Sequence, residues 1–148
     1  MLLRHLLTLV GLAGGPPPQD SLYLVSRTAL AAVEGDSAKR VRARLTATAA
    51  ARPSDPRPAL GLAYLSLFEY DYADAARAFR SIRATPGLSE AASGYATMGL
   101  AQTALSQGNA AEADSLLAEA IRIAHAARAG HVEAEALVTR TLTSARVH

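Results

Sequence analysis

The chain has 148 residues, of which 50% are hydrophobic and 19% are charged. This length and composition allow one buried core and argue against two independent globular domains. Fifteen Lys and Arg stand against thirteen Asp and Glu, a near balance that disfavours nucleic acid as a partner. Cysteine is absent, which excludes disulfides, thiolate metal sites and a cysteine nucleophile. Alanine is abundant and aromatic residues make up only 5%, so helix is the favoured backbone state.

The first residues have the layout of a secretory signal peptide. Arg4 and His5 precede an apolar stretch, 6–13, and a run of glycines and prolines follows. We therefore predict a signal peptide and Pro-rich spacer over 1–19, a folded domain over 20–148, and export to the periplasm or the extracellular space. If the leader is not functional, the chain is cytoplasmic. No run approaches the roughly 20 apolar residues that cross a bilayer, so we expect no membrane span.

The first part of the folded region predicts three helices. The segment 21–34 places Leu22, Val25, Ala29 and Val33 on one helical stripe, and Gly35-Asp36-Ser37 then ends that helix and offers caps for the next. A second helix is expected over 37–51. Three prolines between 53 and 58 break the pattern, and Ser54 or Asp55 can cap a third helix over 57–68.

Four further helices are expected toward the C-terminus. One covers 72–84 and is closed by Thr85-Pro86-Gly87; Ser89 can then cap a helix over 90–106. Asn109 followed by Glu112 fits a capping box, which starts a helix that runs to about residue 128. The last helix is expected over 131–146.

A self-comparison reveals an internal repeat. At an offset of about 38 residues, 61–63 aligns with 99–101 and the turn 70–72 aligns with the turn 108–110. Leu67 pairs with Leu105, and Phe79 pairs with Leu117. Because the turns coincide as well as the apolar residues, the two segments are expected to be copies of one helix-turn-helix unit.

These residues resemble the tetratricopeptide repeat (TPR) family over about 56–129. A small residue midway along the first helix, an aromatic residue at the turn and Ala-x-x-x-Phe on the second helix are represented by Ala63, Tyr72, Ala75 and Phe79. The resemblance implies an all-α fold of stacked antiparallel helical hairpins, a short right-handed TPR-like solenoid. We expect about three hairpins, 21–52, 57–86 and 90–129, and one C-terminal helix.

The resemblance also implies where a partner would bind, because in this family the first helix of each hairpin lines a concave groove. The groove residues expected on this basis are Leu60, Tyr64, Leu67, Phe68, Tyr95, Met98, Gln102 and Leu105. The family's clamp for a C-terminal carboxylate uses Lys, Arg and Asn at such positions, so a more apolar peptide or helix is the expected ligand. Replacing Tyr64 and Phe68 by alanine is expected to abolish binding without unfolding the chain.

Signs of catalysis and of cofactor binding are missing from the sequence. It contains no Gly-x-Ser-x-Gly elbow, no phosphate-binding glycine loop and no dinucleotide-binding unit. His5, His125, His131 and His148 do not have the spacing of a metal site, so we expect neither metal nor cofactor. Glu69, Asp71 and Asp74 lie near a turn, where carboxylates usually cap helices. We expect the protein not to be an enzyme and to have no small-molecule substrate.

Three functions remain in consideration. The first is a protein-protein interaction module, able to form a homo-oligomer, that binds a peptide or helix of a partner protein. The second is the N-terminal sensor or scaffold portion of a larger TPR protein with a downstream effector domain. The third is a nucleic-acid binder that uses the basic face over Lys39 to Arg44, although no aromatic residues for base stacking lie among the arginines.

Overall fold

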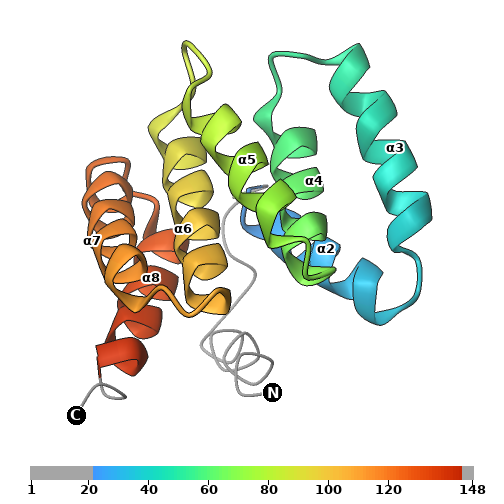
Figure 1. The fold of residues 1–148 in the computed structure, drawn as a ribbon. Helices are drawn as coiled ribbons and strands as arrows, with labels where there is room; N and C mark the ends of the chain where they lie inside the picture. Colours follow the sequence, from blue (N-terminus) through green and yellow to red (C-terminus); the bar gives the residue numbers. More distant parts are fainter. Residues whose placement is uncertain (1–21, 145–148) are drawn as a thin grey trace, which may run out of the picture.

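The computed structural model describes residues 22–144, and every regular element in that range is an α-helix (Figure 1). The expected leader and spacer, 1–19, lie outside the described residues. The helices are α2 (Tyr23–Glu34), α3 (Ala38–Ala51), α4 (Pro56–Phe68), α5 (Tyr72–Arg83), α6 (Glu90–Ser106), α7 (Ala110–Ala126) and α8 (Gly130–Ser144). These bounds lie within two residues of the predicted ones, and the all-α class is confirmed.

Side-chain caps fix the starts of several helices. The Asp55 carboxylate accepts a hydrogen bond from the amide of Arg57, and the Ser89 hydroxyl accepts one from the amide of Ala92. Asn109 Oδ1 accepts from the Glu112 amide, as expected. Its Nδ2 donates to the Glu112 carboxylate at 2.7 Å, so this pair interacts through the two side chains. These contacts satisfy amides that a helix start leaves without a partner.

The turn after each of four helices has the same backbone form. Asp36, Tyr70, Gly108 and Arg128 all have positive φ, and in each case the next residue's amide donates to a carbonyl five residues earlier. Such a left-handed residue ends a helix and reverses the chain. Tyr70 and Gly108 occupy equivalent places in the internal repeat, so the two copies turn in the same way although only one uses glycine.

Successive helices from α3 to α8 pack side by side. Each of α4, α5, α6 and α7 contacts the helix before it and the helix after it, and α4 also touches α6, as α6 touches α8. In Figure 1, α3 stands at one edge of the molecule, while α7 and α8 stand at the other. One apolar cluster runs through this array, with buried residues from α2 and from α4 to α8.

The first expected hairpin, 21–52, differs from the other two. Its helices α2 and α3 contact each other little, whereas α2 packs closely on α4 (Figure 1). The reason lies in the side chains: α2 buries only Ser26, Ala29 and Ala32, which let it approach α4 closely, and α3 buries no residue at all. The helix α2 therefore covers one side of α4 and does not complete a hairpin with α3.

Candidate functional site

Five of the eight residues expected to line a groove lie in the core. Leu60, Tyr64, Leu67, Tyr95 and Met98 are all buried, with at most 5% of their surface exposed. In this arrangement they hold the helices together and offer no surface to a partner. Phe68, Gln102 and Leu105 are only partly buried. Phe68 and Gln102 lie together beside one pocket, but Leu105 is not part of its lining.

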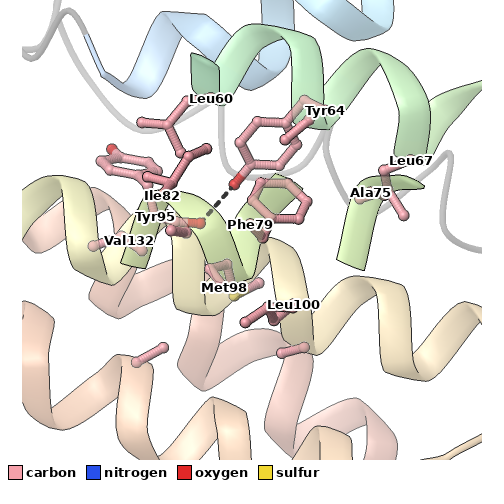
Figure 2. Close-up of a cluster of buried hydrophobic side chains, with 14 of the residues drawn as sticks. Leu60, Tyr64, Leu67, Ala75, Phe79, Ile82, Tyr95, Met98, Leu100 and Val132 are labelled. Atoms are coloured by element: carbon pink, nitrogen blue, oxygen red, sulfur yellow. Dashed lines mark hydrogen bonds between the residues drawn. The ribbon is translucent and has the colours of Figure 1, made fainter. Parts of the chain in front are cut away.

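Tyr64 is held on all sides in the centre of the core (Figure 2). Its hydroxyl donates to the carbonyl of Tyr95 at 3.1 Å, which joins α4 to α6. Its ring meets the Phe79 ring edge-on, with centroids 5.0 Å apart, and stacks on Phe68 at 6.0 Å. Burial raises the pKa of the Tyr64 hydroxyl well above its usual value, and the charge of Glu135 adds to this effect.

This placement corrects one expectation from the sequence. Replacing Tyr64 by alanine would remove a buried aromatic side chain and leave a cavity, at a cost of roughly 3–5 kcal/mol. The expected double substitution of Tyr64 and Phe68 would therefore destabilise the fold, so a loss of binding could not be assigned to the groove. Phe68 can be substituted alone to test binding, because part of its side chain is exposed.

The pocket beside Phe68 has a volume of about 340 Å³ and is formed by four helices. It lies where α2 faces α4, α6 and α8. Ser26, Arg27, Leu30, Ala31 and Glu34 come from α2, and Phe68, Gln102 and Glu135 come from the other three helices. A site that needs side chains from four separate elements is a product of the tertiary fold.

Glu135 and Gln102 form the polar end of this pocket. Gln102 Nε2 donates to Glu135 Oε1 at 3.0 Å and is the only hydrogen-bond donor to that carboxylate within 22–144. Burial raises the pKa of the Glu135 carboxyl, against the smaller opposing effects of the Gln102 hydrogen bond and the Arg27 charge. Gln102 Oε1 is enclosed and accepts no hydrogen bond from the described part of the chain. The pocket therefore contains acceptors that are incompletely satisfied.

The α2 side of the pocket is held by aromatic contacts. Arg27 donates to the Tyr23 hydroxyl at 3.2 Å, and its guanidinium lies 5.6 Å from the centre of the Tyr23 ring. The same ring stacks on His131 of α8, with centroids 4.5 Å apart. Through these contacts α2 bridges from α4 to α8 and forms one wall of the pocket.

A second cleft, of about 340 Å³, lies on the other side of α2, where α2 and α3 diverge above α4. Val25, Val41 and Leu45 are among its apolar lining residues, and Arg52, Asp55 and Arg57 also line it. Asp55 and Arg57 are already joined by an ion pair at 2.7 Å and by the helix cap. This cleft has an apolar lining, and its one carboxylate among the lining residues, Asp55, is already paired with Arg57.

The basic face of α3 is less uniform than the sequence indicates. Lys39, Arg40 and Arg44 are exposed, whereas Arg42 turns toward α4 and pairs with Glu69. The carboxylates near the following turn have structural contacts: Asp71 caps α5 by accepting from the Asp74 amide, and Asp74 accepts from the Ser66 hydroxyl at 2.7 Å. Ser66 chiefly, with help from Arg77, lowers the pKa of Asp74.

Between 22 and 144, no three His, Cys, Asp or Glu side chains lie where they could hold a metal ion. In the same range no helix combines the length and apolar character that crossing a membrane requires.

The sequence did not reveal most of the pocket. It indicated Phe68 and Gln102, but Ser26, Arg27, Glu34 and Glu135 were missed because α2 was expected to pair with α3. Nothing in the sequence distinguishes Glu135 from the other polar residues of α8. The small side chains that α2 buries indicate that another helix can pack closely on it. They do not identify which helix that is.

Comparison with known proteins adds no relative. No protein-family model matches the sequence, and neither a curated protein nor a solved structure matches it. The function must therefore be argued from the pocket and its surroundings.

Proposed function

We propose that the protein is a non-catalytic interaction module, a short TPR-like array of helices that binds a peptide or helix of a partner protein. The binding face is centred on the pocket where α2 meets α4, α6 and α8. The observation that carries this proposal is the pocket itself, with a partly exposed aromatic ring, Phe68, beside the polar pair Gln102 and Glu135. Apolar surface with a few convergent polar groups is typical of binding sites.

The internal repeat supports the TPR-like interpretation. The equivalent turns at Tyr70 and Gly108, and the alternating contacts of α4 with α5 and of α6 with α7, are those expected of two similar hairpins in sequence. In that arrangement α4, α6 and α8 are the first helices of successive units. They would supply one continuous face, and the pocket lies on it.

The partner segment would lie beside α2. Phe68 offers an aromatic anchor point, and Leu30 and Ala31 of α2 add apolar surface along the same pocket. A helix or an extended peptide with one or two large side chains would fit such a face, because a few anchors usually supply most of the binding energy.

Selection from a displayed peptide library tests this proposal. The full chain is the target, and each enriched peptide is then titrated against the wild type and against Phe68→Ala, with helicity checked by circular dichroism. We expect binding to weaken at least about tenfold in Phe68→Ala, as for an interface anchor. Arg40→Ala, on the exposed side of α3, is the matched control and should bind as the wild type does. Peptides that bind Phe68→Ala as tightly as they bind the wild type would contradict the proposed binding face.

A second candidate function is favoured by the outer side of α8. Leu137, Val138 and Leu142 expose 47%, 38% and 40% of their surface. A further helix packed on this side would cover them, as in a longer repeat protein that carries an effector domain downstream. The coding sequence tests this alternative: an in-frame continuation of the helical repeat supports it, and a stop codon directly after His148 contradicts it.

A further inference from the structure

The helix α8 has two faces without charged residues. Val132 and Ala136 are completely buried in the core. On another side of the same helix, five exposed and uncharged residues follow the helical spacing i, i+3, i+4, i+7, i+8, namely Ala134, Leu137, Val138, Thr141 and Leu142. These five residues are the α8 stripe. Such spacing is typical of a helix face that packs on another helix, but within 22–144 no helix covers this one.

The opposite edge of the molecule carries an apolar cleft, the α2/α3 cleft. It has a volume of about 340 Å³ and lies where α2 and α3 diverge above α4 (Figure 1). Leu24 of α2, one of its lining residues, exposes 57% of its surface. Val41 and Leu45 line it from α3 and are only partly buried. Because α2 and α3 contact each other little, their apolar side chains leave this edge open as well.

These two faces contain four of the five exposed large hydrophobic side chains found between residues 22 and 144. Leu24 lies at the α2/α3 cleft, and Leu137, Val138 and Leu142 lie in the α8 stripe. The fifth, Tyr70, is in the turn between α4 and α5. Single exposed apolar residues are ordinary, whereas apolar patches mark contacts with another molecule. The ends of a stacked helical array usually present a polar outer face, so apolar surface at both ends indicates that both ends are covered.

The two edges also differ in charge. Residues 22–57, which include α2 and α3, have seven Lys and Arg against three Asp and Glu, a net charge of +4. Residues 90–144, which form α6 to α8, have three Arg against six Asp and Glu, a net charge of −3. The segment between them, 58–89, has three of each sign. Ion pairs within the chain leave this separation unchanged, because both members of each pair are counted. The described chain therefore has a basic end and an acidic end.

From these observations we infer that the protein associates head to tail with a second copy of itself, with the α8 stripe of one copy packed in the α2/α3 cleft of the next. This contact covers both kinds of apolar face and brings an acidic end to a basic one. A symmetric pairing of two α8 stripes, or of two clefts, would instead bring ends of like charge together.

The head-to-tail contact has two consequences. It leaves one face uncovered at each end of a dimer, so further copies can add to it. Neither face includes Phe68 or Gln102, so self-association and the proposed peptide binding use different surfaces. The inference therefore goes beyond the proposed function and does not depend on it.

Two variants of the full chain, each with one face blocked, test the inference. The double substitution Val138→Asp and Leu142→Asp places charge in the α8 stripe, and Leu24→Asp places charge at the α2/α3 cleft. All three side chains are exposed, so the helicity should be kept, which circular dichroism checks. Sedimentation velocity over a range of concentrations measures association. We expect the wild type to associate as its concentration rises, and each variant alone to associate at least about tenfold more weakly.

An equimolar mixture of the two variants distinguishes a head-to-tail contact from a symmetric one. Each variant supplies the face that the other lacks, so the mixture should form a dimer of one copy of each, with about the wild-type affinity and with no larger species. Self-association of Leu24→Asp as strong as that of the wild type would overturn the inference, since it is the result of a symmetric pairing of α8 stripes. A mixture that stays monomeric, or a wild type that stays monomeric up to about 1 mM, would overturn it as well.

Tyr70→Asp is the matched control. It places the same charge at an exposed hydrophobic position outside both faces, and aspartate tolerates the left-handed backbone of that turn. We expect this variant to associate as the wild type does. A loss as large as that in the two blocked variants would show that added charge alone prevents association, which would contradict the assigned faces.

Discussion

Gly99 makes room for Phe79. A β-carbon built at Gly99 of α6 would lie 2.3 Å from two ring atoms of Phe79 on α5, well inside the contact distance of carbon atoms. Phe79 is completely buried, and its ring also meets the Tyr64 ring. The absence of a side chain at Gly99 therefore fixes how closely α5 and α6 pack and where the central aromatic ring lies.

Gly99→Ala is expected to destabilise the chain although it raises helix propensity. The added methyl group overpacks the core against Phe79, and we expect a loss of about 2–3 kcal/mol in the free energy of unfolding. Urea denaturation followed by circular dichroism measures this loss. Gly130→Ala is the control, because a β-carbon there meets no atom within 4 Å. A loss of similar size in both variants would show that Phe79 is not the cause.

Tyr70 offers a route to higher stability. It has φ of 68°, and 78% of its surface is exposed, so a bulky side chain holds a left-handed backbone without a buried contact in return. Tyr70→Gly should raise the free energy of unfolding by about 0.5–1 kcal/mol, because glycine adopts this conformation without steric strain. Gly108→Ala, at the equivalent turn, should lower it by a similar amount. Thermal unfolding of both variants checks the opposite signs.

The sequence predicted local structure much better than it predicted contacts between helices. Prolines, turn residues and caps such as Asp55 and Asn109 act within a few positions, so they place helix ends without knowledge of the rest of the fold. The packing of α2 depends instead on which helix surface best accepts Ser26, Ala29 and Ala32, and the alanine-rich sequence offers several such surfaces. Because α2 was expected to pair with α3, its residues were not included in the expected binding face.

The burial of Tyr64 and Met98 shows the same limit. Their helical positions resemble those that line a groove, but the period of a helix does not say which neighbour covers a given stripe. Phe68 and Gln102 line one pocket, and each follows a buried residue of its own helix by one turn. Glu135 required knowledge of how α8 faces α2.

Tyr64→Phe isolates the hydrogen bond between α4 and α6. The substitution keeps the ring contacts and removes the donor to the Tyr95 carbonyl at 3.1 Å. We expect the free energy of unfolding to fall by about 1–2 kcal/mol, since a buried acceptor loses this donor. Chemical denaturation gives the value, and Tyr72→Phe, at a partly exposed position, serves as the control. Equal stability of Tyr64→Phe and the wild type would mean that this hydrogen bond contributes nothing net.

Glu135 should give the stability a distinct pH dependence. Its carboxyl pKa is raised in the folded chain above the ordinary value of 4.5, so folding favours the protonated form. As pH rises through the interval between the ordinary and the raised pKa, ionisation lowers the stability of the wild type. Glu135→Gln cannot ionise, so it should gain stability relative to the wild type over the pH range that begins at the ordinary pKa of 4.5 and extends upward to the raised pKa.

Urea denaturation of both proteins across that range measures the difference. A constant difference would mean that the Glu135 pKa is not raised in the folded chain. A difference that moves the opposite way would mean that the carboxylate is stabilised in its ionised form, as a fixed ion pair with Arg27 would do.

The most direct measurement of the binding face is an NMR map of the full chain with one selected peptide bound. We expect the largest shifts at Phe68, Gln102 and the residues around Glu135, and we expect these shifts to disappear in Phe68→Ala while the helicity is kept. Shifts confined to Lys39, Arg40 and Arg44 of α3, or to the cleft between α2 and α3, would contradict the account and move the interaction site away from the pocket.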